Sequence, residues 1–235
     1  MNKFFSKSMA VAAFTVAAFV TGQAHASAVI GGTSLLSTAN VDQLATWLGQ
    51  GSIDLTNIFT KQAGNTSFDF HAAADGKGAT FVVMQVTDTN TGLTGLVGGY
   101  DPLSWSSDGG WYLVDPLATT GFLFNLTSGV FSAERTDWQG QYQTYNSSNY
   151  GPTFGGGHDL YVDDSLTFSY MYAWSYATQN GSNLLGQSSY SFDLAVSSLE
   201  VFTISPGNTV PEPTSIALVG LALCGMFAAR RRKKA

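Results

Sequence analysis

The chain has 235 residues, a formal net charge of −6 and a single cysteine, Cys224, close to its C-terminus. Residues 27–209 hold three basic and fifteen acidic residues, which gives this part a formal charge of −12 and no cysteine. The negative charge excludes nucleic acid as a partner, because the surface repels phosphates. The absence of cysteine excludes a disulfide or a thiol nucleophile in residues 27–209.

Residues 1–26 have the organisation of a secretory signal peptide. Two lysines charge its start, residues 9–20 are apolar, and Ala24 and Ala26 form a small-x-small cleavage site. The apolar stretch is shorter than the ~20 residues of a membrane-spanning helix, which favours a signal peptide over an N-terminal anchor. We expect an exported chain that begins at residue 27.

Residues 210–235 combine a short motif, an apolar segment and a basic tail. The motif is Val210, Pro211, Glu212, Pro213 and Thr214, and the tail includes Arg230, Arg231 and Arg232. As a helix, the fourteen apolar residues 216–229 reach about 21 Å, less than the ~30 Å hydrocarbon core, so any span is short. The positive-inside rule keeps the tail cytoplasmic and places the preceding chain across the inner membrane.

Together, these three parts resemble the PEP-CTERM sorting signal of Gram-negative bacteria. The resemblance implies transient insertion of residues 216–229 into the inner membrane and processing by an exosortase-type protease. It also implies delivery to the cell envelope, the surface or an extracellular matrix, with exopolysaccharide or envelope proteins as partners. An ordinary single-span C-terminal anchor is the alternative.

Two helices are predicted at the start of the central part. Apolar residues recur at the spacing of one helical face at Val41, Leu44, Ala45 and Leu48. We expect Asn40 to cap this helix and Gly49 to end it. A second, shorter helix is predicted over residues 54–61.

From residue 80 onward, short runs rich in β-branched and aromatic residues alternate with turn residues, which is typical of an all-β domain. Strands are predicted over residues 80–87, 93–100, 121–127, 165–178 with one interruption, and 191–204. Burial of such strands predicts a mainly β fold, a two-sheet antiparallel β-sandwich with a few short helices. Residues 27–209 form one such domain, and apolar helices are expected at both ends of the chain.

The stretch from Gly151 to Tyr161 concentrates conformationally special residues. Three successive glycines, Gly155 to Gly157, permit positive φ or close approach of another group, and Pro152 fixes its own φ. We expect the backbone of this stretch to have a specific shape, with a strand from residue 160.

The order of motifs from residue 35 to residue 204 resembles the TLDc domain of eukaryotic oxidation-resistance proteins. The matching residues are Phe70, His71, Gly76, Gly98, Gly99, Tyr100, Gly151, Pro152, Phe154, Gly155, Gly156, Asp159 and Glu200. The resemblance implies a β-sandwich that acts as an interaction module, with no established catalytic centre and no cofactor. Ala73 and Ala74 stand where the family often has a cysteine, so a redox role of that thiol does not apply.

Two histidines remain after residue 26, and a histidine acid or base would have to be one of them. His71, next to Phe70, fits a structural, hydrogen-bonded role. His158 and Asp159 are the candidate catalytic residues, because a carboxylate can orient an imidazole. The glycines beside them are also explained by turn geometry alone.

Aromatic residues in polar surroundings are candidates for stacking on sugar rings, or else belong to the core. They are Trp105, Trp111, Trp138, Tyr142, Tyr145 and Tyr150. No metal site is predicted, since the aspartates lack the spacing of a calcium loop.

Three hypotheses follow. The first is a non-enzymatic surface or matrix protein that acts by binding. The alternatives are an exported hydrolase that uses His158 and Asp159, and a carbohydrate-binding module.

Overall fold

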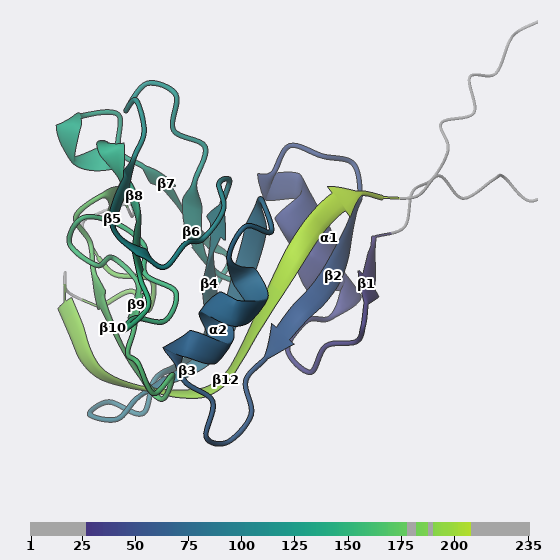
Figure 1. Cartoon of the computed structure of the whole chain (residues 1–235), viewed down its shortest axis with the longest axis horizontal. Helices are drawn as coiled ribbons and strands as arrows, with labels where there is room; N and C mark the ends of the chain where they lie inside the picture. Colours follow the sequence, from purple (N-terminus) through teal and green to yellow (C-terminus); the bar gives the residue numbers. More distant parts are fainter. Residues whose placement is uncertain (1–26, 178–181, 188–189, 208–235) are drawn as a thin grey trace, which may run out of the picture. The chain divides into compact units, whose positions relative to one another are not determined.

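The computed structural model describes residues 27–177, 182–187 and 190–207 (Figure 1). The predicted signal peptide, the sorting motif and the apolar helices expected at both ends lie outside these residues. Among the described helices, none has the length and apolar character that crossing a membrane requires.

Twelve strands, two α-helices and one 3₁₀ helix follow one another along the described residues. They are β1 (Ala28–Ile30), α1 (Thr38–Trp47), β2 (Ile53–Thr60), α2 (Ser67–Ala74), β3 (Thr80–Asp88), β4 (Thr94–Asp101), β5 (Asp108–Leu113), β6 (Phe122–Asn125), β7 (Val130–Glu134), the 3₁₀ helix (Trp138–Gln141), β8 (Tyr142–Ser147), β9 (Tyr161–Val162), β10 (Phe168–Tyr172), β11 (Tyr176–Ala177) and β12 (Tyr190–Pro206). The mainly β fold with short helices is confirmed.

The strands form two sheets. The large sheet has the order β1-β2-β12-β3-β4-β6-β7-β11, with β10 and β9 joined to it through β12, and the small sheet pairs β5 with β8. β1 and β2 are parallel, whereas the other pairs of described strands are antiparallel. The long β12 runs through the sheet and pairs with β10, β3 and β2 (Figure 1).

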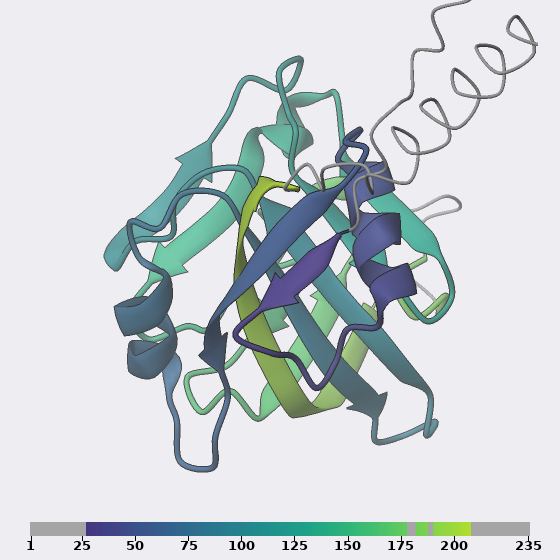
Figure 2. The ribbon, with the colours of Figure 1, turned by 90° about the vertical axis from the view of Figure 1, so that its right-hand side faces the viewer.

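Hydrophobic side chains pack on both faces of the large sheet. Along β3, Phe81 and Val83 enter one core cluster, while Val82, Met84 and Val86 enter the other. Helix α1 covers the first face and α2 covers the second, so the two helices lie on opposite sides of the strands (Figure 2). This two-sided burial explains why residues 81–84 of β3 form an unbroken apolar run.

Helix α1 confirms the predicted amphipathic helix and corrects its cap. Ser37 is the N-cap, and its side chain accepts a hydrogen bond from the amide of Asn40, three residues later. Asn40 returns the interaction by accepting from the Ser37 amide, which completes a capping box. Gly49, with φ of 69°, follows the helix end as expected.

The helix predicted over residues 54–61 is wrong, because this segment is strand β2. Ile53 and Leu55, two residues apart, enter the core on the α1 side, whereas Ile58 and Phe59 pack against the core on the α2 side. Strand β2 lies between β1 and β12, so pairing on both edges satisfies the backbone and outweighs the weak helical spacing.

Candidate functional site

The triple-glycine loop combines a tight turn with close packing. Gly155 has φ of 79°, and its carbonyl accepts a 2.9 Å hydrogen bond from the His158 amide. A Cβ at Gly156 would lie 2.2 Å from Cζ3 of Trp174, and one at Gly157 would lie 2.5 Å from Cδ1 of Tyr172. The last two glycines therefore let aromatic rings lie directly on the loop backbone.

His158 follows this loop in a left-handed conformation, with φ of 57°. Its Nδ1 lies 2.6 Å from the Tyr170 hydroxyl, and its ring stacks on Tyr161 at 5.4 Å between centroids. Burial lowers the pKa of His158, so the imidazole is neutral at neutral pH. Further rings surround it, those of Trp111, Tyr145 and Tyr150.

Asp159 is buried, and its carboxyl group accepts hydrogen bonds from backbone amides. Oδ1 accepts hydrogen bonds from the amides of Trp174, at 2.7 Å, and Tyr176, at 2.8 Å. Within the described residues, no hydrogen bond joins this carboxyl to the His158 ring, whose Nδ1 contacts Tyr170 instead. The two candidate residues are adjacent in sequence but do not form the carboxylate–imidazole pair that the hydrolase hypothesis requires.

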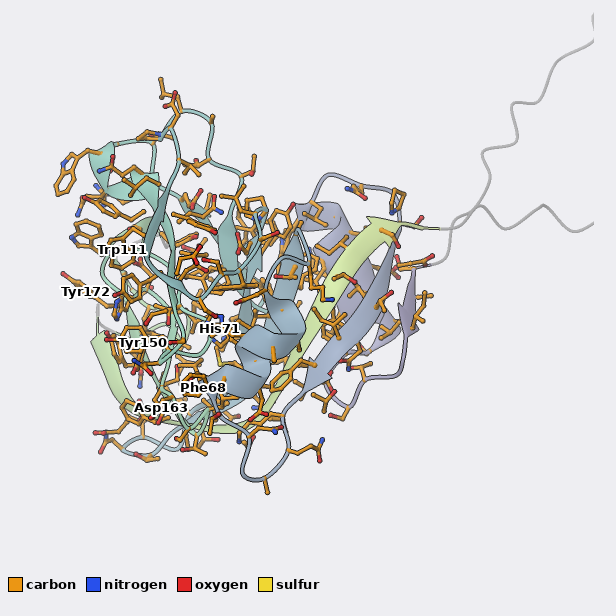
Figure 3. All side chains as sticks on the ribbon, viewed as in Figure 1. Phe68, His71, Trp111, Tyr150, Asp163 and Tyr172 are labelled. Atoms are coloured by element: carbon orange, nitrogen blue, oxygen red, sulfur yellow. The ribbon has the colours of Figure 1, made fainter. Side chains whose placement is uncertain are left out.

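A continuous surface of aromatic rings surrounds His158. We call it the aromatic face, and it comprises Trp111, Trp138, Tyr142, Tyr145, Tyr150, His158, Tyr161, Tyr170 and Trp174. Neighbouring ring centroids are 4.6 to 5.9 Å apart. Trp138 is 63% exposed, and the other eight are partly exposed. Figure 3 shows Trp111 and Tyr150 along one side of the domain.

Five of the six aromatic residues singled out in the sequence lie on this face, and Trp105 does not. Its side chain is 1% exposed, and its indole packs edge-on against Phe70 and Phe154. Its Nε1 donates a 2.9 Å hydrogen bond to Thr80 Oγ1. Trp105 is therefore a core residue, which is the other of the two roles considered for it in the sequence.

His71 lies in α2 and is not part of the aromatic face. Its ring is buried, with Nδ1 at 2.7 Å from Asp75 Oδ1 and Nε2 at 2.9 Å and 3.1 Å from the carbonyl oxygens of Ser147 and Tyr150. These contacts connect α2 to the chain around β8. A structural role remains the interpretation of His71.

Several other residues of the TLDc-like pattern lie where the backbone is closely packed against neighbouring groups. A Cβ at Gly98 would lie 1.9 Å from the Val82 carbonyl oxygen, and one at Gly99 would lie 2.6 Å from Phe154. Gly76 has φ of 70°. The buried Glu200 accepts hydrogen bonds from Thr33 and Ser34. The remaining members are buried or partly buried, namely Phe70, Tyr100, Gly151 and Pro152.

Three buried carboxyl groups, those of Asp101, Glu134 and Asp159, interact electrostatically with Tyr176. Burial is the main cause that raises their pKa values, to about 6 for Asp101 and to about 7 for Glu134 and Asp159. Each has one oxygen without a hydrogen-bond partner. No group of three metal-ligating side chains occurs among the residues that the structure describes.

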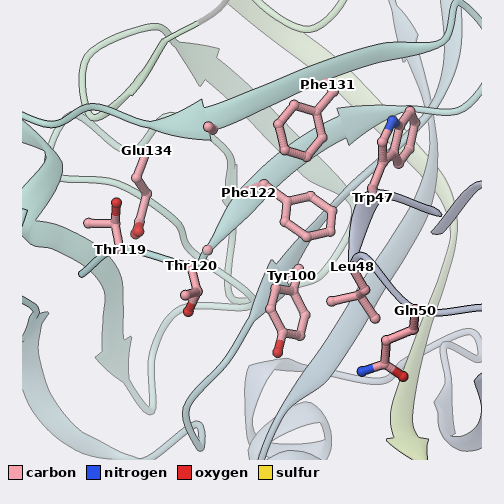
Figure 4. Close-up of a pocket in the computed structure, with 11 residues that line it drawn as sticks. Trp47, Leu48, Gln50, Tyr100, Thr119, Thr120, Phe122, Phe131 and Glu134 are labelled. Carbon is pink, nitrogen blue, oxygen red and sulfur yellow. The ribbon is translucent and has the colours of Figure 1, made fainter. Parts of the chain in front are cut away.

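A separate pocket of about 420 Å³ opens beside the end of α1 and strands β4, β6 and β7. Trp47, Tyr100, Phe122 and Phe131 line its apolar part, and Glu134 lies at the other end (Figure 4). Trp47, Phe122 and Phe131 pack on the α1 side of the sheet. This pocket and the aromatic face share no residue.

Comparison with known proteins agrees with the fold. A model of the TLDc domain matches residues 29–205, and a model of the PEP-CTERM protein-sorting motif matches residues 209–233. No curated protein matches the chain. The sorting motif indicates export to the envelope or surface of a bacterial cell and implies processing by an exosortase. Because the first match covers most of its length, the chain belongs to the TLDc domain family.

Proposed function

We propose that this protein is a non-enzymatic binding protein of the bacterial surface or extracellular matrix, and that its TLDc domain binds through the aromatic face. The sorting motif supports the location. In a Gram-negative cell, a signal peptide at residues 1–26 starts export, and exosortase processing follows transient insertion of residues 216–229.

The aromatic face is the observation that carries this proposal. Nine neighbouring rings remain partly or largely exposed on a domain that has two well-filled hydrophobic clusters. Exposed aromatic residues that cluster are the usual anchors of recognition surfaces, since they offer large contact areas with few rotatable bonds. Most of the rings lie on strands, in the 3₁₀ helix or on the hydrogen-bonded glycine loop, so little conformational freedom is lost on binding.

The hydrolase alternative has less support. A histidine base is usually oriented by a carboxylate that is hydrogen-bonded to one ring nitrogen, whereas Nδ1 of His158 contacts the Tyr170 hydroxyl and rings pack around the imidazole. Asp159 serves two backbone amides. Binding therefore explains the arrangement of these residues more directly than proton transfer does.

Fractionation and capture together test the proposal. Full-length protein, wild type or Trp111→Ala, is immobilised and exposed to an envelope and matrix fraction of the producing bacterium. We expect the protein itself in that fraction, capture by the wild type, and reduced capture by the variant. A cytoplasmic location, or equal capture by both proteins, would overturn the proposal.

A turnover assay addresses catalysis. Ester, peptide and glycan substrates are incubated with the wild type and with His158→Ala. We expect no turnover by either protein. Hydrolysis by the wild type that the variant loses would favour the hydrolase.

A further inference from the structure

We infer that the aromatic face is a carbohydrate-binding surface for a neutral polysaccharide, whose pyranose rings stack on its aromatic rings. This inference rests on the proposed binding function and names the class of ligand. Its basis is the composition, geometry and charge of the face.

The rings form a connected path that suits an extended chain. From the exposed Trp138, contacts lead through Trp174 and Tyr142 to Trp111, each step 5.4 to 5.6 Å between centroids. From Trp111, the path continues over His158 to Tyr161. The negative π-face of an aromatic ring attracts the weakly positive C–H groups that a pyranose presents on its flat side. Neighbouring planes are 83° apart for Trp138–Trp174 and for Trp111–Tyr142, so a sugar chain along this path meets ring faces and ring edges in turn.

Polar groups accompany the rings. Tyr142, Tyr145 and Tyr150 carry hydroxyl groups, and Ser147 and Asn149 lie between them on the same segment. The Tyr161 hydroxyl, whose ordinary pKa of 10 is raised further by burial, is protonated at neutral pH and can donate a hydrogen bond. A ring face bordered by hydroxyl and amide groups matches the alternating apolar and hydroxyl surfaces of a sugar.

The composition around the rings favours a glycan over a protein partner. Residues 139–151 contain Gln, Tyr, Thr, Asn, Ser and Gly, with no Leu, Ile, Val, Lys or Arg. Protein interfaces usually join aromatic anchors to aliphatic residues or arginine in their buried centre. In this segment, the neighbours of Tyr142, Tyr145 and Tyr150 are small or uncharged polar residues.

Charge selects a neutral glycan. Residues 27–209 carry a formal charge of −12. Near the Trp138 end, Arg135 pairs with Asp137, and Asp163 and Asp164 follow Tyr161 in the sequence. Acidic polysaccharides would be repelled at physiological ionic strength, at which surface charges act over about 8 Å.

Affinity electrophoresis tests the inference directly. Full-length wild-type protein is run through gels that contain one soluble probe each: dextran, laminarin, hydroxyethylcellulose, the deproteinised neutral polysaccharide of the producing bacterium, or alginate as the acidic probe. We expect retardation by at least one neutral probe and none by alginate. Bound glycan should also reduce iodide quenching of tryptophan fluorescence, since three of the five tryptophans lie on the face.

Variants connect binding to the face. Trp111→Ala and Tyr161→Ala should each weaken binding about tenfold, the loss expected for one stacked ring. Trp138→Ala removes a ring that is 63% exposed, so it tests the face without risk to the fold. Phe68→Ala is the matched control, because Phe68 is 60% exposed on α2, and its binding should equal that of the wild type. A urea titration confirms that each variant is folded.

The outcomes separate this inference from the proposed function. If folded wild-type protein binds none of the neutral probes, or if binding is unchanged in all three face variants, the inference is overturned. If capture from the matrix fraction depends on Trp111 but the captured partner is a protein, the inference falls and the proposed binding function stands. If capture from the envelope or matrix fraction is the same for the wild type and the face variants, both the inference and the proposed function are overturned.

Discussion

The hydroxyl of Tyr176 lies 3.0 Å from Oε1 of Glu134 and also 2.9 Å from the carbonyl oxygen of Gln143. One hydroxyl proton cannot serve two acceptors fully. If the Glu134 carboxyl is protonated, it donates to Tyr176, which then donates to Gln143, and each contact has a donor. The raised pKa of Glu134, about 7, agrees with this arrangement.

Stability is therefore expected to decrease as pH rises. The folded-state pKa of Glu134 lies above its ordinary value of 4.5, so its contribution is complete below about pH 4.5 and is lost as pH rises through about 7. At 1.36 kcal/mol per unit, the loss is on the order of 3 kcal/mol. Asp101 and Asp159, whose pKa values are also raised, act in the same direction.

Urea unfolding between pH 4.5 and pH 8 measures this dependence. Glu134→Gln should decrease the slope, because its amide donates to Tyr176 at every pH. A variant with the same slope as the wild type would show that Glu134 titrates normally.

Asp159 should stabilise the domain through its acceptor oxygen rather than its charge. Asp159→Ala leaves the amides of Trp174 and Tyr176 without their acceptor, at a cost of about 3 kcal/mol in free energy of unfolding. Asp159→Asn retains an acceptor oxygen and should cost less than about 1 kcal/mol. Urea titrations of the two variants at pH 6 compare these costs, and equal losses would contradict this account.

Local patterns predicted much of the fold. The apolar run in β3, the alternation of large residues in β6 and β12, and the spacing in α1 are local signals, and these elements lie where the sequence placed them. Strand β2 was missed because its stability comes from pairing with β1 and β12, and its partners in β12 lie more than 130 residues away in the sequence. Such long-range pairing leaves no trace in an eight-residue window.

The aromatic face was predicted only in part, because its residues also come together through long-range contacts. Trp111, Tyr142 and Tyr145 were recognisable as aromatics in polar surroundings. Tyr161, Tyr170 and Trp174 join them only through the fold, although alternation along residues 170–174 marks rings on one side of a strand. The burial of Asp101 and Glu134 near Tyr176 had no local signal at all.

Gly156 should be required for the position of Trp174. A Cβ there would lie 2.2 Å from the indole and 3.0 Å from Cβ of Tyr142, so Gly156→Ala should displace the ring and cost about 1 to 3 kcal/mol. Gly51→Ala is the control, since no atom lies within 4 Å of its added Cβ and its φ is not positive. Its free energy of unfolding should stay within about 0.5 kcal/mol of wild type. Unaltered tryptophan fluorescence and stability in Gly156→Ala would refute this role.

Glu200 should hold the segment before α1 against β12. Its carboxylate is 1% exposed and accepts hydrogen bonds from the Thr33 hydroxyl and from the amide and hydroxyl of Ser34, the latter two at 2.8 and 2.9 Å. Glu200→Ala removes every one of these acceptors, so we expect a loss of about 2 to 3 kcal/mol and faster exchange of the Ser34 amide hydrogen. Ser34→Ala keeps the hydrogen bond from the amide of residue 34 to Glu200, so this amide should retain most of its protection from hydrogen exchange. Hydrogen exchange followed by NMR distinguishes the two, and equal protection of the Ser34 amide in Glu200→Ala and wild type would show that this carboxylate does not hold the segment.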